Sequence, residues 1–164
     1  MTIPFNADEI FEIAERIEHN GAAFYRKAAS LSSDPQARQV LLDLASMEQR
    51  HLETFTAMRA ALSRSEWKPV FDPDRQTVLY LRSIADGHIF NAKANPAESL
   101  TGRESPQEVL RLAIGLEKDS VIFYQELRQI VPERMGRDRL ERIIGEEFRH
   151  ITVLNEELAK LNRR

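Results

Sequence analysis

The sequence IEHNGAAFY at residues 17–25 has a counterpart, LEKDSVIFY, at residues 116–124. A second pair follows, with MEQRHL at residues 47–52 and EEFRHI at residues 146–151. Both pairs share one offset of 99 residues, from 17 to 116 and from 47 to 146. Apolar residues alone align easily between any two amphipathic helices, so the matching Glu, Tyr and His residues are the informative part. The repeat predicts two copies of one helical hairpin.

Four long stretches have the apolar periodicity of amphipathic helices. We predict a first helix from Asn6 that fades at Ser32-Ser33, a second from Asp34 to about Ser63, a third from Ser105 to about Ile130, and a fourth that follows Pro132 and runs through Leu158. Three sequence signals mark the helix starts: Glu9 after Asn6 and Glu108 after Ser105 as capping boxes, and Pro35 at a first helical position.

The links between these helices predict their arrangement. Short links make antiparallel neighbours of the first and second helices and of the third and fourth, whereas a long link joins the second to the third. We therefore expect an all-α four-helix bundle with one long crossover connection, which forms a single domain over residues 1–164. It consists of a hairpin over 6–63, a crossover over 64–105 with a short helix from about 74 to 90, and a hairpin over 105–162.

Composition excludes several classes of protein. The 164 residues include no cysteine, so disulfides, zinc fingers and iron–sulfur clusters are excluded, and any metal must be held by carboxylates or histidines. A net charge of −3 gives no electrostatic case for nucleic acid or an anionic membrane as a partner. No run approaches the roughly 18 apolar residues of a membrane span, and the N-terminus does not resemble a signal peptide. We expect a cytoplasmic protein.

Each half of the repeat carries one Glu on its first helix and Glu-x-x-His on its second. These residues lie in the middle of apolar stripes that should face the core, where an ionised carboxylate costs several kcal/mol unless it is paired or metal-bound. Two divalent cations would balance four carboxylates, and oxygen ligands with imidazoles suit iron or manganese, with zinc also possible. The candidate metal ligands are Glu18, Glu48, His51, Glu117, Glu147 and His150.

Two simpler interpretations remain open for the acidic residues. The four core glutamates could pair with arginines in a polar bundle core. Glu15, Glu53 and Glu146 are read more simply as surface charges, although Glu53 or Glu146 could reach an edge of the site. His19 follows Glu18 but points about 100° away on a helix, so we expect it to be a solvated surface residue.

The four motifs quoted above resemble those of the rubrerythrin branch of the ferritin-like di-iron carboxylate superfamily, over roughly residues 7–62 and 106–160. The resemblance implies that Glu18 and Glu117 each bind one metal, that Glu48 and Glu147 bridge two metals, and that His51 and His150 each cap one. It also implies that Tyr25 and Tyr124 hydrogen-bond to the carboxylate ligands and orient them.

The sequence departs from the rubrerythrin pattern in two places. Rubrerythrins carry a rubredoxin-like domain with four cysteines that supplies electrons, and we expect this chain to lack it and to depend on an external electron donor. Rubrerythrins also place an extra Glu, associated with hydrogen peroxide reduction, where this chain has Ser120. That difference favours a six-ligand centre of the ferritin or bacterioferritin type.

The leading functional hypothesis is a di-iron oxidoreductase that binds two Fe ions and reacts with O₂ or H₂O₂, in oxidative-stress defence or iron handling. One alternative is a metal-binding or iron-storage protein without turnover, and another is a metal-free helical interaction module. We expect a homodimer or a larger homo-oligomer.

Overall fold

Four helices of 25 or 26 residues account for most of the described chain. The structure is a computed structural model that describes residues 7–62, 79–80, 83 and 95–163. The elements are α1 (Ala7–Leu31), α2 (Pro35–Ala60), the 3₁₀ turn η1 (Pro96–Ser99), α4 (Pro106–Ile130), the 3₁₀ turn η2 (Glu133–Met135) and α5 (Arg137–Asn162). The described residues contain no strand, and the predicted all-α bundle of four helices is confirmed.

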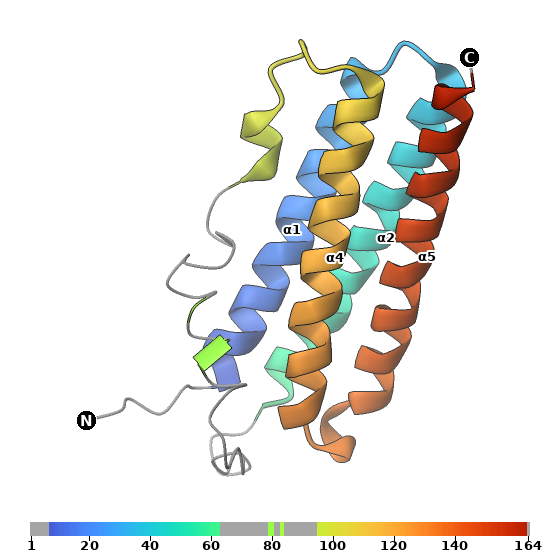
Figure 1. Cartoon of the computed structure of the whole chain (residues 1–164). Coiled ribbons are helices and arrows are strands. Elements are labelled where there is room, and N and C mark those ends of the chain that lie inside the picture. The colour runs from blue at the N-terminus through green and yellow to red at the C-terminus, as the bar shows by residue number, and fades with distance from the viewer. Residues whose placement is uncertain (1–6, 63–78, 81–82, 84–94, 164) are drawn as a thin grey trace.

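The four helices run side by side as two antiparallel hairpins (Figure 1). α1 packs most extensively on α2, and α4 on α5, while α1 also contacts α4 and α2 contacts α5. α2 ends at the lower end of the bundle in Figure 1, and α4 begins at the upper end. The link between the two hairpins therefore has to cover the length of the bundle, and η1 packs against α1 on the way.

Two of the predicted helix starts are stabilised by the expected caps. The Asp34 side chain accepts hydrogen bonds from the backbone N–H groups of Gln36 and Ala37, at 2.9 and 3.2 Å. Ser105 and Glu108 form a capping box, with Glu108 N donating to Ser105 Oγ at 3.2 Å and Ser105 N donating to Glu108 Oε2 at 2.7 Å. The capping role expected of Asn6 lies outside the described residues.

The predicted start of the fourth long helix is wrong by several residues. We expected the helix to follow Pro132, but η2 comes first and α5 begins only at Arg137. Gly136 between them has φ +97°, a left-handed conformation that a right-handed helix cannot include. Of the short helix expected over 74–90, only residues 79–80 and 83 are described, and these are helical.

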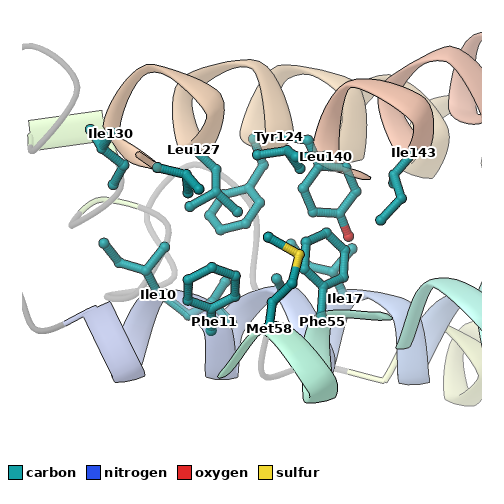
Figure 2. Close-up of a cluster of buried hydrophobic side chains, with 14 of the residues drawn as sticks. Ile10, Phe11, Ile17, Phe55, Met58, Tyr124, Leu127, Ile130, Leu140 and Ile143 are labelled. Atoms are coloured by element: carbon teal, nitrogen blue, oxygen red, sulfur yellow. The ribbon is translucent and has the colours of Figure 1, made fainter. Parts of the chain in front are cut away.

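Two apolar clusters fill the bundle, one toward each end. The first cluster, drawn in Figure 2, includes Phe11, Phe55, Phe123, Leu127 and Leu140. The second cluster includes Phe24, Leu41, Leu44, Ala113 and Leu154. On each helix the two clusters are separated along the chain by the positions of the candidate ligands, so a polar layer lies between two apolar ones.

Among the described helices, none combines the length and the apolar character that crossing a membrane requires.

The capping box at α4 gives a prediction for stability. Ser105→Ala removes the side-chain oxygen that caps Glu108 N, and we expect a loss of about 1 kcal/mol in the free energy of unfolding, measured by urea denaturation. Ser105→Gly serves as the control, because glycine at this position costs only a few tenths of a kcal/mol. Equal stability of the alanine variant and the wild type would contradict the prediction.

Candidate metal centre

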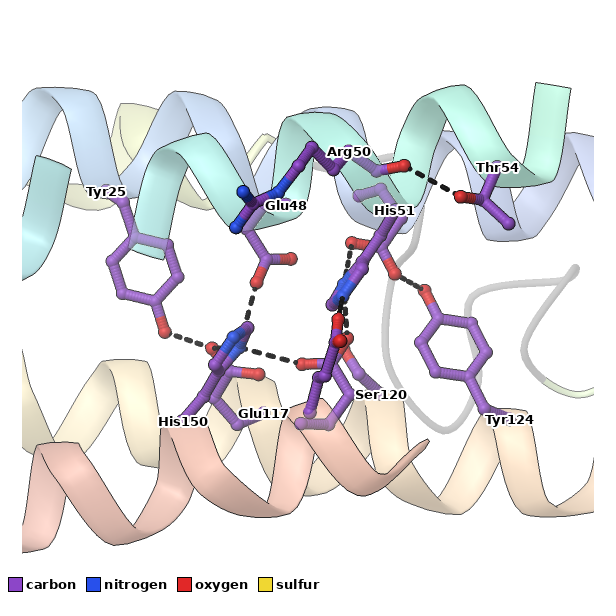
Figure 3. Close-up of polar contacts among 12 residues, drawn as sticks. Tyr25, Glu48, Arg50, His51, Thr54, Glu117, Ser120, Tyr124 and His150 are labelled. Atoms are coloured by element: carbon purple, nitrogen blue, oxygen red, sulfur yellow. Dashed lines mark hydrogen bonds and ion pairs between the residues drawn. The ribbon is translucent and has the colours of Figure 1, made fainter. Parts of the chain in front are cut away.

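All six candidate ligands lie close together in the bundle core. Figure 3 shows four of them, Glu48, His51, Glu117 and His150. α1 contributes Glu18 and α4 contributes Glu117, while the Glu-x-x-His pairs come from α2 and α5. None of the six is more than 4% exposed: Glu18, Glu48, His51, Glu117, Glu147 and His150. These six residues lie on the apolar faces of their helices. Because those faces pack into the core, the six polar side chains are buried with them.

The six residues form two overlapping groups, each able to hold one metal ion. The first group is Glu18, Glu48, His51 and Glu147, and the second is Glu48, Glu117, Glu147 and His150. Within each group the candidate donor atoms all lie within 4.8 Å of one another. Glu48 and Glu147 belong to both groups, so two ion positions would lie next to each other and share two carboxylates.

Glu147 lies between the two histidines and presents one oxygen to each. Its Oε1 is 3.0 Å from His51 Nδ1, and its Oε2 is 3.1 Å from His150 Nδ1. Both histidines therefore turn the same nitrogen toward the cluster. Glu18 Oε2 is 3.5 Å from His51 Nδ1, and Glu48 Oε1 is 3.1 Å from His150 Nδ1.

Seven buried side-chain atoms in this cluster lack a hydrogen-bond partner. They are Glu18 Oε2, Glu48 Oε1, His51 Nδ1, both carboxylate oxygens of Glu147, and Nδ1 and Nε2 of His150. Several of these nitrogen and oxygen atoms lie about 3 Å apart, but the geometry of the pairs does not meet that of a hydrogen bond. Buried polar atoms without partners are rare in native proteins. All seven atoms belong to residues of the two groups, and cations between the helices would satisfy the atoms that face the cluster.

The alternative of a polar core with arginines does not describe this cluster. Within the described ranges, the cationic partners within ion-pair distance of these four glutamates are His51 and His150. Arg59, by contrast, binds carboxylates at the outside of α1, including Glu15 at 2.6 Å and Asp8 at 2.7 Å.

The electrostatics of the metal-free cluster favour bound protons. Burial and neighbouring carboxylates raise the pKa of Glu48 well above its usual range and that of Glu147 to about 8. Burial lowers the pKa of His51 and of His150, but the adjacent carboxylates outweigh this and raise each pKa to about 12. Imidazolium groups thus supply positive charge that a metal ion would otherwise bring.

Tyr25 and Tyr124 both hydrogen-bond to carboxylates of the cluster, and they do so across the two halves. The Tyr25 hydroxyl donates to Glu117 Oε1, and the Tyr124 hydroxyl donates to Glu18 Oε1. Burial, followed by the nearby carboxylates, raises the pKa of both phenols, so they remain protonated donors. Sequence reasoning anticipated bonds to carboxylates but not this crossing between α1 and α4.

Glu146 reaches the site, although its sequence position was read more simply as a surface charge. Its Oε2 lies 2.7 Å from His51 Nε2, the ring nitrogen that faces away from the cluster. The side chain is 36% exposed, which explains why periodicity alone places it at the surface. Glu53 is exposed and His19 is exposed.

Gly21 leaves room for one of the shared carboxylates. A Cβ atom at this position would lie 2.8 Å from Glu48 Oε2. The related position in the second half is Ser120, which is buried and donates its hydroxyl to its own helix, at Leu116 O, at 3.1 Å. Small residues thus occupy both related positions beside the cluster.

Comparison with known proteins agrees with the four-helix fold. The sequence matches the profile of the family described as Ferritin-like domain over residues 6–160. The fold is similar to a crystal structure of a candidate ferritin-like diiron-carboxylate protein from Thermotoga maritima, with a TM-score of 0.68 and 24% sequence identity. The match covers 97% of this chain and 98% of that chain. No curated protein matches the sequence.

The close approach at Gly21 gives a prediction for metal affinity. Gly21→Ala forces the Glu48 carboxylate to move, and we expect affinity for Zn(II) to fall about 10-fold in a chelator competition assay. Gly115→Ala is the matched control, because its added Cβ meets no atom within 4 Å. That variant should bind Zn(II) normally and be more stable by about 0.5–1 kcal/mol. Unchanged affinity in the Gly21 variant would contradict the prediction.

The raised pKa values of His51, Glu147 and His150 predict a pH dependence of metal binding. Cations must displace the protons on these groups, so we expect Zn(II) affinity to rise as pH increases from about 6 to 8. Calorimetry in buffers of different ionisation enthalpy should report proton release on binding. Binding that is independent of pH and of buffer would show this reasoning to be wrong.

Proposed function

The chain belongs to the ferritin-like domain family, and on that premise we propose that it is a di-iron carboxylate protein that reacts with O₂ or H₂O₂. One observation carries the proposal: the two groups of candidate ligands share Glu48 and Glu147, and Glu147 presents a different oxygen to each histidine. Four carboxylates with neutral imidazoles balance the charge of two divalent ions, and this donor set fits iron.

Each residue of the centre has a role in this proposal. Glu48 and Glu147 would contribute to both ion positions, while Glu18 and His51 would complete one position and Glu117 and His150 the other. The Tyr124 and Tyr25 hydroxyls keep the Glu18 and Glu117 carboxylates oriented through their hydrogen bonds. The two apolar clusters at either side keep bulk water away from the centre.

When bound, two ferrous ions supply two electrons, which with two protons reduce O₂ to H₂O₂ or reduce H₂O₂ to two water molecules. Ser120 favours the ferroxidase form of this activity over the peroxidase form, because its hydroxyl is bonded to its own helix and adds no carboxylate to the six ligands. Continued turnover draws electrons either from further Fe(II) or from an external electron donor.

We also propose a family branch, a cellular role, a location and an assembly for the protein. We place the chain near the rubrerythrin branch on the strength of its four motifs, and we assign it to iron handling or oxidative-stress defence in the cytoplasm. A homodimer or a larger homo-oligomer is the proposed assembly.

An anaerobic Fe(II) titration tests the proposed function. We expect two irons per chain, followed by rapid oxidation when O₂ or H₂O₂ is added separately and followed by absorbance. Slow oxidation with more than two irons retained would instead indicate storage. Absence of iron binding would overturn the di-iron proposal and leave a metal-free helical module.

Variants of the shared glutamates test whether iron binds at the Glu/His cluster. Glu48→Gln and Glu147→Gln should abolish two-iron binding and also the metal-dependent rise in thermal stability. That rise corresponds to about 2.7 kcal/mol at a metal concentration 100 times the dissociation constant. His19→Ala is the control, because His19 is exposed next to Glu18 and should bind two irons as the wild type does.

A further inference from the structure

We propose that the two metal positions are unequal, because Glu146 positions His51 while no described residue supports His150 in the same way. The position formed by Glu18 and His51 should bind its ion more tightly than the position formed by Glu117 and His150. This inference rests on the proposed function, since it presupposes that the centre holds two ions.

The His51 ring is engaged at both nitrogens. Its Nδ1 faces Glu147 Oε1 at 3.0 Å, on the cluster side, and its Nε2 lies 2.7 Å from Glu146 Oε2, on the outer side. A metal-binding histidine commonly donates its second N–H to a carboxylate, which fixes the tautomer and the ring orientation and strengthens the ligand. Glu146 on α5 is placed to do this for His51 on α2.

The His150 ring is engaged on the cluster side only. Its Nδ1 lies 3.1 Å from carboxylate oxygens of Glu48 and Glu147. Its Nε2 is buried, and no residue in the part of the chain that the structure describes forms a hydrogen bond with it. The two rings are otherwise alike, since they are nearly parallel, with an interplanar angle of 18° and centroids 5.7 Å apart.

The internal repeat relates Glu146 to a residue of different chemistry. The offset of 99 residues relates position 146 to position 47, which is Met47. Both residues are half-buried. A methionine thioether is only a weak acceptor, whereas a carboxylate accepts strongly from an imidazole N–H. The two halves therefore supply equivalent ligands but unequal support for them.

The difference between the two histidines predicts the order in which the two ions bind. Loss of a carboxylate behind a metal-binding histidine typically lowers metal affinity by about 10–100-fold. The first ion should therefore occupy the His51 position, and the second should bind at the His150 position with lower affinity.

Zn(II) titration of the wild-type protein against a chelator tests the order of binding. We expect two steps that differ by about 10-fold or more. Crystals grown with one equivalent of Zn(II) should show the stronger anomalous density between Glu18 and His51. This readout does not depend on activity or on any variant.

Variants of Glu146 test the cause. Glu146→Ala should weaken the tighter step by about 10–100-fold, change the weaker step by less than about 3-fold, and remove the preference seen at one equivalent. Glu146→Gln, which keeps an acceptor oxygen without the charge, should have an intermediate effect and guards against a folding defect in the alanine variant. Glu156→Ala, an exposed change on the same helix, is the control and should bind as the wild type does.

The outcomes separate this inference from the proposed function. Two equal steps in the wild type, or equal weakening of both steps by Glu146→Ala, would overturn the inequality and leave the di-metal centre standing. If no Zn(II) binds to the Glu/His cluster, the proposed function fails and the inference fails with it.

Discussion

The structure depends on one constraint, which is that four carboxylates lie together in a core that is otherwise apolar. Glu18, Glu48, Glu117 and Glu147 are each at most 4% exposed, and their ionised forms repel one another. Such a cluster requires positive charge at its centre and fixed donors at its edges. Positive charge comes from the histidines and from the cations that we propose, and the tyrosine hydroxyls are the fixed donors. The apolar clusters on either side exclude water, which strengthens these electrostatic interactions.

The constraint also ties the two halves of the chain together. Tyr25 of the first hairpin bonds to Glu117 of the second, and Tyr124 of the second bonds to Glu18 of the first. Each group of four candidate ligands likewise takes residues from both hairpins. Neither hairpin contains a complete ion position, although each repeats the same ligand pattern. The two halves therefore share their ligands but differ in some of the residues around them, as at Met47 and Glu146.

The sequence predicted the main helices and their approximate ends because periodicity and caps are local properties. It missed the delayed start of α5, where Gly136 in a left-handed conformation separates η2 from the helix. It also favoured a surface charge at Glu146, with a place at the edge of the site as the alternative. A partly exposed side chain on α5 contacts α2 only when the two helices are set at a particular rotation, and no feature within either helix encodes that rotation.

The all-α bundle, the hairpin repeat and the six polar residues that point into the core could all be predicted from the sequence. These follow from which residue types recur at helical spacing, because burial acts on faces of helices. Only the tertiary structure decided which atoms meet: the division of the Glu147 oxygens between two histidines, the crossed tyrosines, and the contact of Glu146 with His51. Those contacts depend on the relative rotation and height of four helices, which packing of the whole core sets.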